Sequence, residues 1–168
     1  MTMNLEIERK FLLKDFPRFP GNLITTGSVI HQTYLASKDE KITARVRERI
    51  YGDRTEYSHT VKKRIADGIH EETEELITAA KYKELMLQRD PEKVTIYKLR
   101  TVFIWQNQTF EIDCFEHPKR ICNLVVLEIE LASMTTPIEF PPFIEIDREV
   151  THDRKYTNAA LARIRNDH

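Results

Sequence analysis

The stretch that decides the fold lies near the start of the chain and reads LEIERKFLL, residues 5–13. In a β-strand successive side chains point to opposite faces, so Glu6, Glu8 and Lys10 would line one face about 7 Å apart. Leu5 and Ile7 would then lie on the other face. A helix would scatter the charges around its axis, and β-branched and aromatic residues favour a strand. The stretch therefore predicts a strand with one charged and one apolar face, although such alternation alone usually marks a face in water.

The same spacing of like charges returns in five further segments of the chain. These pairs, basic in some segments and acidic in others, are Arg45/Arg47, Glu72/Glu74, Lys98/Arg100, Glu111/Asp113 and Glu128/Glu130. Two like charges on one strand are costly unless charges of the opposite sign face them. We therefore predict a closed antiparallel β-barrel with its charged faces inward and its apolar faces outward.

Length and composition limit the classes of function. A chain of 168 residues predicts one domain, residues 1–168, and its 26 basic side chains nearly balance 27 acidic ones. No overall charge would attract nucleic acid or an anionic membrane. No signal sequence is recognisable, and no apolar run approaches the roughly 18 residues of a membrane-spanning helix. We expect a cytoplasmic protein with neither nucleic acid nor a membrane as partner.

Turn residues and periodicity divide the rest of the chain into strands and two short helices. Further strands are expected over residues 28–36, 42–50, 56–63, 69–77, 94–105, 109–115, 123–131 and 144–151. A helical period over 78–88, with Thr78 as N-cap, and another over 157–165 predict the helices. The pattern is that of an α+β protein with an antiparallel barrel. Cys114 and Cys122 match no zinc spacing and are expected to be reduced core residues.

A charged interior of this kind predicts a site for a multiply charged anion. Arginine offers paired donors to phosphate oxygens, and lysine offers a mobile point charge. Carboxylates in the same interior would repel the anion unless a divalent cation lies between them, and oxygen ligands suit Mg²⁺ or Mn²⁺. The alternative is a barrel filled by reciprocal ion pairs, which are poor stabilisers when buried. The candidate anion ligands are Lys10, Arg45, Arg47, Lys62, Lys98 and Arg100.

These residues resemble the CYTH superfamily, the triphosphate tunnel metalloenzymes, along almost the whole chain. The opening residues 6–10 match the ExExK signature. The other motifs follow in the family's order as QTYL (32–35), RVR (45–47), TVK (60–62), KLR (98–100), FEIDCF (110–115), LEIEL (127–131), EVT (149–151), YTN (156–158) and LA (161–162). The closing segment is similar to the short bacterial members. The resemblance implies a closed eight-stranded barrel that forms a tunnel.

By motif position, the resemblance also implies a role for each charged group. A Lys10/Tyr34 pair would handle the proton of an attacking water, with the pKa of Lys10 lowered by neighbouring cations. The six basic residues would hold the phosphates. Mg²⁺ or Mn²⁺ would bind to Glu6, Glu8, Glu128 and Glu130, with Asp113 as a further candidate ligand. Additional tunnel residues would be Glu72, Glu74 and Glu111.

One position departs from the family pattern. Members commonly carry Arg-x-Glu-x-Glu in the fifth strand, and here His70 stands in place of the arginine. This puts in doubt a fixed charge at one end of the tunnel, and a surface histidine and a binding role both stay open. Arg9, Arg49 and Lys63 are expected to be solvated.

The resemblance implies an enzyme that hydrolyses inorganic triphosphate, a small-molecule substrate, with a divalent metal. Class IV adenylate cyclase, thiamine triphosphatase, action on the RNA 5′ end and a non-catalytic triphosphate-binding protein are the alternatives. No motif is assignable to a base, which disfavours the cyclase. The intact Lys10 and complete acidic pairs disfavour a dead site. The sequence leaves open whether the protein is a dimer.

Overall fold

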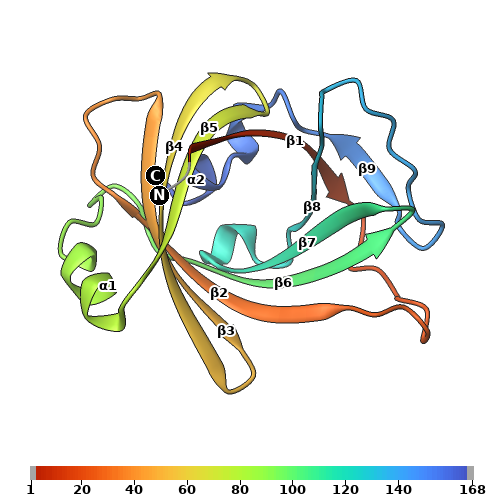
Figure 1. Ribbon diagram of the computed structural model, residues 1–168, viewed down its shortest axis with the longest axis horizontal. Helices are drawn as coiled ribbons and strands as arrows, with labels where there is room; N and C mark the ends of the chain where they lie inside the picture. Colours follow the sequence, from red (N-terminus) through yellow and green to blue (C-terminus); the bar gives the residue numbers. More distant parts are fainter. Residues whose placement is uncertain (1–2, 166–168) are drawn as a thin grey trace.

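The structure is a computed structural model that describes residues 3–165 and consists mainly of one antiparallel sheet (Figure 1). Its strands are β1 (Met3–Leu13), β2 (Thr26–Leu35), β3 (Ile42–Tyr51), β4 (Arg54–Ala66), β5 (Ile69–Ile77), β6 (Ile96–Trp105), β7 (Gln108–His117), β8 (Val125–Glu130) and β9 (Ile146–Glu149). Its helices are α1 (Ala79–Met86) and α2 (Asn158–Leu161), with the 3₁₀ turns η1 (Lys119–Ile121) and η2 (Arg154–Tyr156). No helix in this part of the chain is long and apolar enough to cross a membrane.

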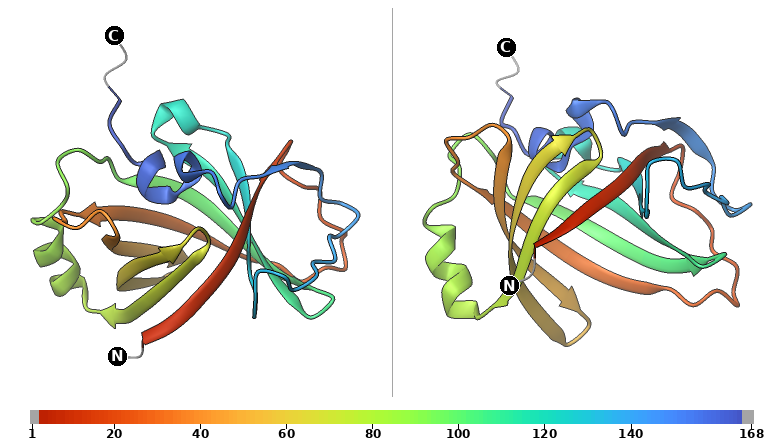
Figure 2. Two further views of the ribbon diagram at one scale, coloured as in Figure 1. Left: turned by 90° about the horizontal axis from the view of Figure 1, so that it is seen from above. Right: turned by 45° about the horizontal axis from the view of Figure 1, so that its top comes forward.

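The first strand closes the barrel by pairing on both of its edges. Residues 3–7 of β1 pair with β5, and residues 8–12 pair with β8. Together with the order β5-β4-β3-β2-β6-β7-β8-β1, this closes a ring of eight strands, and β9 adds to the end of β1. Figure 2 shows β1 running from the β4–β5 hairpin towards β9. The predicted closed eight-stranded antiparallel barrel is confirmed.

The strand predicted over 94–105 begins later than expected, and the helix predicted over 157–165 ends earlier. Both differences arise because the segments beside these two elements pair with each other. Lys93 forms a β-bridge with Arg163. The amide of Val94 donates to the carbonyl of Ala162 at 2.8 Å, and the amide of Ile164 donates to Glu92 at 2.9 Å. A chain that pairs with another extended segment cannot continue as a helix. The predicted helix over 157–165 therefore ends after one turn, and β6 begins at residue 96 rather than 94.

Apolar side chains cover the outer face of β1, β6, β7 and β8, as the alternation predicts. Phe103, Phe110 and Leu127 are buried there, and Phe19 and Phe143 from two loops pack over them. On the other side of the barrel, α1 packs its Leu85 against Leu35 and Val46. This helix begins as predicted, with the Thr78 hydroxyl accepting a hydrogen bond from the amide of Lys81 at 3.1 Å.

The inward face is not charged along its whole length. At one end of the barrel, five strands present apolar or aromatic side chains on the inward face, next to the polar and charged positions. These side chains form a single cluster of Leu12, Tyr34, Ile96, Phe115 and Val126. Ile121 of η1 and Leu161 of α2 belong to the same cluster. The C-terminal segment therefore packs against an apolar layer at one end of the barrel.

The two cysteines lie near this end and are both free. Cys114 on β7 is half-buried, and burial raises the pKa of its thiol, with further contributions from Glu116 and Cys122. Cys122 follows η1 and is exposed. The prediction that both belong to the core is wrong for Cys122, because the turn after η1 faces the surface.

Candidate active site

The barrel encloses a cavity of about 710 Å³ whose wall is built mostly from charged side chains. Seven of the eight barrel strands contribute to it, all except β2. The structure brings most of the predicted residues to this wall, namely Glu6, Glu8, Arg45, Arg47, Lys62, Glu72, Glu74, Arg100, Glu111, Glu128 and Glu130. It places four others outside the lining: Lys10, Tyr34, Lys98 and Asp113.

Strand register brings the carboxylates together around β1. Glu8 lies directly opposite Glu130 of β8, so two like charges face each other across a strand pair. On the other edge, Lys62 Nζ lies 2.7 Å from a carboxylate oxygen of Glu6 and 3.0 Å from one of Glu72. Lysine therefore neutralises one part of the acidic wall, whereas Glu8 and Glu130 have no ion pair within residues 3–165.

Two carboxylates of this wall, the unpaired Glu130 and the Lys62-paired Glu6, have raised pKa values. Burial and the charges of Glu72, Glu111 and Glu8 raise the pKa of Glu130. Burial and a hydrogen bond with Glu72 raise the pKa of Glu6 to about 9, against the attraction of Lys62. A divalent cation between these groups would remove the repulsion, and an all-oxygen donor set suits such an ion. The donors present on β1 and β8 therefore fit a hard divalent metal.

Arginines form the opposite part of the wall, and most of them lack a counter-charge. Neither Arg45 nor Arg47 forms an ion pair within the described part of the chain, and Arg45 Nε is buried without a hydrogen-bond partner there. Arg47 Nη2 donates to Gln32 Oε1 at 2.8 Å. Burial and the charges of Arg45 and Arg100 lower the pKa of Arg47 to about 9. Such a cluster is suited to bind phosphate oxygens.

Arg49 is a residue of this wall that the sequence reasoning missed. It was expected to be solvated, but it lines the cavity and its Nε donates to Ser28 Oγ at 2.9 Å. The signal was present, since Arg49 continues the spacing of two residues that places Arg45 and Arg47 on one face of β3. Arg9, in contrast, forms a bidentate pair with Glu149 of β9, with both distances 2.8 Å.

No hydrogen bond joins the two members of the predicted proton-handling pair, Lys10 and Tyr34, within the described residues, and each has other partners. Lys10 Nζ lies 3.2 Å from Glu128 Oε1 and 3.3 Å from the carbonyl oxygen of Tyr156. Burial opposes the charged ammonium, but Glu128 and Glu8 outweigh it and raise the pKa of Lys10. The predicted lowering is wrong, because carboxylates and not cations surround this lysine. Tyr34 lies in the apolar layer, where its hydroxyl accepts from Gln32 Nε2 at 2.9 Å.

Asp113 and Lys98 form a buried ion-pair network behind the wall. Asp113 Oδ2 lies 2.7 Å from Lys98 Nζ, and Arg100 donates to both oxygens of Asp113 at 2.7 and 2.8 Å. Asp113 is 0% exposed. Its pKa is lowered to about 2, because Arg100 and Lys98 outweigh the effect of burial. With both oxygens bonded to Lys98 and Arg100 and the side chain outside the cavity lining, Asp113 is arranged to orient Arg100 rather than to ligate a metal.

Replacing Asp113 by asparagine should lower the free energy of unfolding by about 3–5 kcal/mol, since it leaves the fully buried Lys98 without its ion-pair partner and removes the bidentate pair of Arg100. Urea unfolding of the purified variant measures this change. Glu111→Gln is the matched control, because within residues 3–165 Glu111 pairs only with Arg100, at 2.6 Å, and its side chain is 34% exposed. The control should cost about 1 kcal/mol or less. Equal losses in both variants would contradict a structural role for Asp113.

The chain is similar in sequence and in fold to known inorganic triphosphatases. No protein-family model matches the chain. An inorganic triphosphatase of Nitrosomonas europaea is 31% identical over 160 residues, covering 94% of this chain and 96% of that protein. The crystal structure of an inorganic triphosphatase superposes with a TM-score of 0.60 at 29% identity, covering 94% of this chain and 93% of the other.

A more distant structure shares the fold. It is a candidate adenylyl cyclase from Hippeastrum with a dominant triphosphatase activity, and it superposes with a TM-score of 0.55 at 16% identity. The match covers 76% of this chain and 80% of that one. At this identity the likeness supports the barrel architecture alone.

Proposed function

The chain belongs to the CYTH superfamily of triphosphate tunnel metalloenzymes, and we propose that it hydrolyses inorganic triphosphate inside its barrel. The observation that carries the proposal is the division of one cavity into an arginine wall and a carboxylate wall. The arginines would bind the phosphate oxygens. The carboxylates would hold a divalent metal, Mg²⁺ or Mn²⁺, which supplies positive charge to the phosphates.

The residues of this chain would act mainly by positioning and electrostatics, as is usual in phosphoryl transfer. Arg45, Arg47 and Arg100 would bind the triphosphate and stabilise the charge that develops on the transferred phosphoryl group. Lys10 is held as an ammonium by Glu128, so it is unsuited to accept a proton and would instead fix the orientation of that carboxylate. Asp113 would in turn hold Arg100 in place.

The cavity also bears on the choice between triphosphate and a nucleotide. No aromatic side chain lines the cavity within residues 3–165, so nothing there is placed to stack on a base. A cyclase must hold ribose and base in register with the α-phosphate, whereas a triphosphatase needs contacts to the phosphates alone. This favours inorganic triphosphate over ATP.

Phosphate release from triphosphate, ATP and thiamine triphosphate, each with Mg²⁺ and with Mn²⁺, tests the proposal. We expect kcat/KM for triphosphate to exceed that for ATP at least about tenfold, which corresponds to about 1.4 kcal/mol. The same reactions are assayed for cyclic AMP. Cyclic AMP as the main product from ATP, with inert triphosphate, would establish the cyclase instead.

A further inference from the structure

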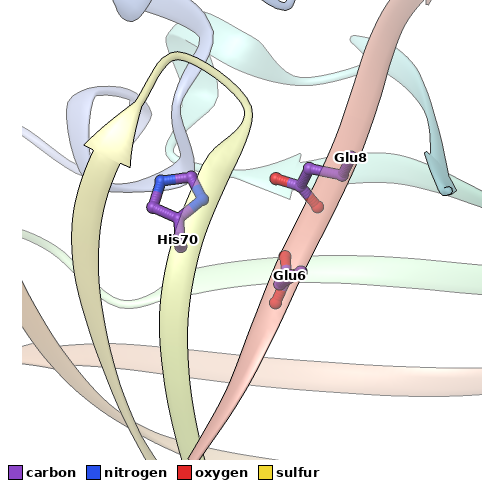
Figure 3. A group of neighbouring side chains, drawn as sticks. All are labelled: Glu6, Glu8 and His70. Atoms are coloured by element: carbon purple, nitrogen blue, oxygen red, sulfur yellow. The ribbon is translucent and has the colours of Figure 1, made fainter. Parts of the chain in front are cut away.

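A second donor type faces the carboxylates at the end of the acidic wall. His70 on β5 lies directly opposite Glu6 of β1, and Glu8 follows on the same face of β1 (Figure 3). One ligand atom from each of the three side chains can be chosen so that all lie within 4.8 Å of one another. Two carboxylates and an imidazole at this separation form a candidate three-ligand metal site.

Backbone geometry holds β5 against β1 at this position. The amide of Glu8 donates to the carbonyl of Gly68 at 2.9 Å. Gly68 has a φ of +76°, and a Cβ there would lie 2.6 Å from the Glu8 carbonyl oxygen. Only glycine allows this close approach without strain. The turn between β4 and β5 is therefore fastened beside the candidate site, which fixes the start of β5 and with it His70.

Two of the three side chains lack a partner in the described part of the chain, whereas Glu6 pairs with Lys62 at 2.7 Å. His70 Nδ1 is buried and has no hydrogen-bond partner in the described part of the chain, although buried polar atoms are nearly always bonded. The Glu8 carboxylate forms no ion pair within the same residues. A buried imidazole without a partner at Nδ1, beside an unpaired carboxylate, is an arrangement that a bound cation would satisfy.

The cluster lies between two cavities. Glu8 lines the large charged cavity and also a separate one of about 40 Å³, and His70 lines only the smaller one. Lys10 and Tyr156 belong to the lining of the smaller cavity. A cation held by all three ligands would therefore face the anion site through the carboxylates, with the imidazole on the side away from it.

We propose that His70 completes, with Glu6 and Glu8, a mixed nitrogen and oxygen site that prefers a first-row transition metal to Mg²⁺. Imidazole suits ions such as Co²⁺, Ni²⁺ and Zn²⁺, whereas Mg²⁺ prefers oxygen ligands and keeps several waters. The inference rests on the proposed function only in treating Glu6 and Glu8 as metal ligands. Its test measures metal binding without substrate, so the proposed metal site and the proposed triphosphatase activity can fail separately.

The test titrates Co²⁺ and Mg²⁺ separately into the metal-free full chain. Calorimetry measures the affinity for both ions, and visible absorption also monitors the binding of Co²⁺. His70→Asn should weaken Co²⁺ binding at least about tenfold and Mg²⁺ binding by less than about threefold, because it removes the only nitrogen ligand of the three. His31→Asn is the matched control. His31 pairs with Glu48 at 2.9 Å and lines neither cavity, so its loss should leave both affinities unchanged.

A second variant keeps the test decisive if the first is poorly folded by circular dichroism. His70→Cys replaces the imidazole with a thiolate, and Co²⁺ should then show a sulfur charge-transfer band in the near ultraviolet. Because Cys122 is an exposed free thiol, the unchanged protein is titrated in parallel, and a band found only in His70→Cys reports direct coordination at position 70. Unchanged Co²⁺ affinity in His70→Asn, or a His70→Cys chain without the band, would overturn the site. Phosphate release with Mg²⁺ in the same variants reports separately on the proposed function.

Discussion

Replacing Glu130 by glutamine should lower kcat for triphosphate at least about 100-fold, because a metal-bound phosphoryl group gains several kcal/mol of charge stabilisation. The folded state should not suffer. Glu130 has no ion pair within the described residues, and its pKa is raised by burial and by Glu72, Glu111 and Glu8. A carboxylate with a raised pKa in the folded state costs stability once it ionises. The free energy of unfolding at neutral pH should therefore stay the same or rise.

Phosphate release and urea unfolding of the same preparation check both parts of this expectation. Glu128→Gln provides the contrast, since Glu128 pairs with Lys10 at 3.2 Å and its pKa lies well below the ordinary value. That variant should lose activity and stability together. Glu145→Gln removes an exposed pair with Lys14 and should leave activity unchanged. Full hydrolysis by Glu130→Gln, or by the unchanged protein in excess chelator, would refute the metal-dependent reaction.

Replacing Arg47 by methionine should lower kcat/KM for triphosphate about 100-fold, since hydrogen bonds from charged donors contribute about 1.5–3 kcal/mol each. Burial, Arg45 and Arg100 lower the pKa of Arg47, so its positive charge destabilises the empty barrel at neutral pH. The midpoint of thermal unfolding should therefore stay the same or rise in the variant. Triphosphate should raise the midpoint of the unchanged protein much more than that of the variant.

Kinetics and thermal unfolding with and without triphosphate measure these effects. Arg9→Met is the matched control, because Arg9 pairs with Glu149 and does not line the cavity. The control should keep its activity and its response to triphosphate. A normal KM and a normal response to triphosphate in Arg47→Met would show that the arginine wall does not bind the anion.

Alternation along single strands was enough to predict the charged interior. Glu6, Glu8, Arg45 and Arg47 all line the cavity, because the pleat sends every second side chain to the same face. The charges on one strand need opposite charges on another, and closing the sheet supplies them. The barrel and the inward direction of its charges therefore followed from local stereochemistry and Coulomb's law.

Alternation alone did not predict how far along the barrel each charged side chain lies, or which side chain it contacts. Lys98 and Asp113 obey the same alternation as Arg100, yet they form a buried network behind the wall. Lys10 was expected among cations and lies opposite Glu128. These differences arise from the register between strands, which depends on pairings between distant segments.

Which side chains point inward could be read from the residues alone, since it depends only on the two-residue period of each strand. Which of these side chains come into contact depends on how the strands pair. The closed barrel brings Glu8 opposite Glu130 and sets His70 beside Glu6 and Glu8. The face of a strand on which a side chain lies is a local property of the backbone, whereas contacts between side chains of different strands depend on the register of the closed barrel.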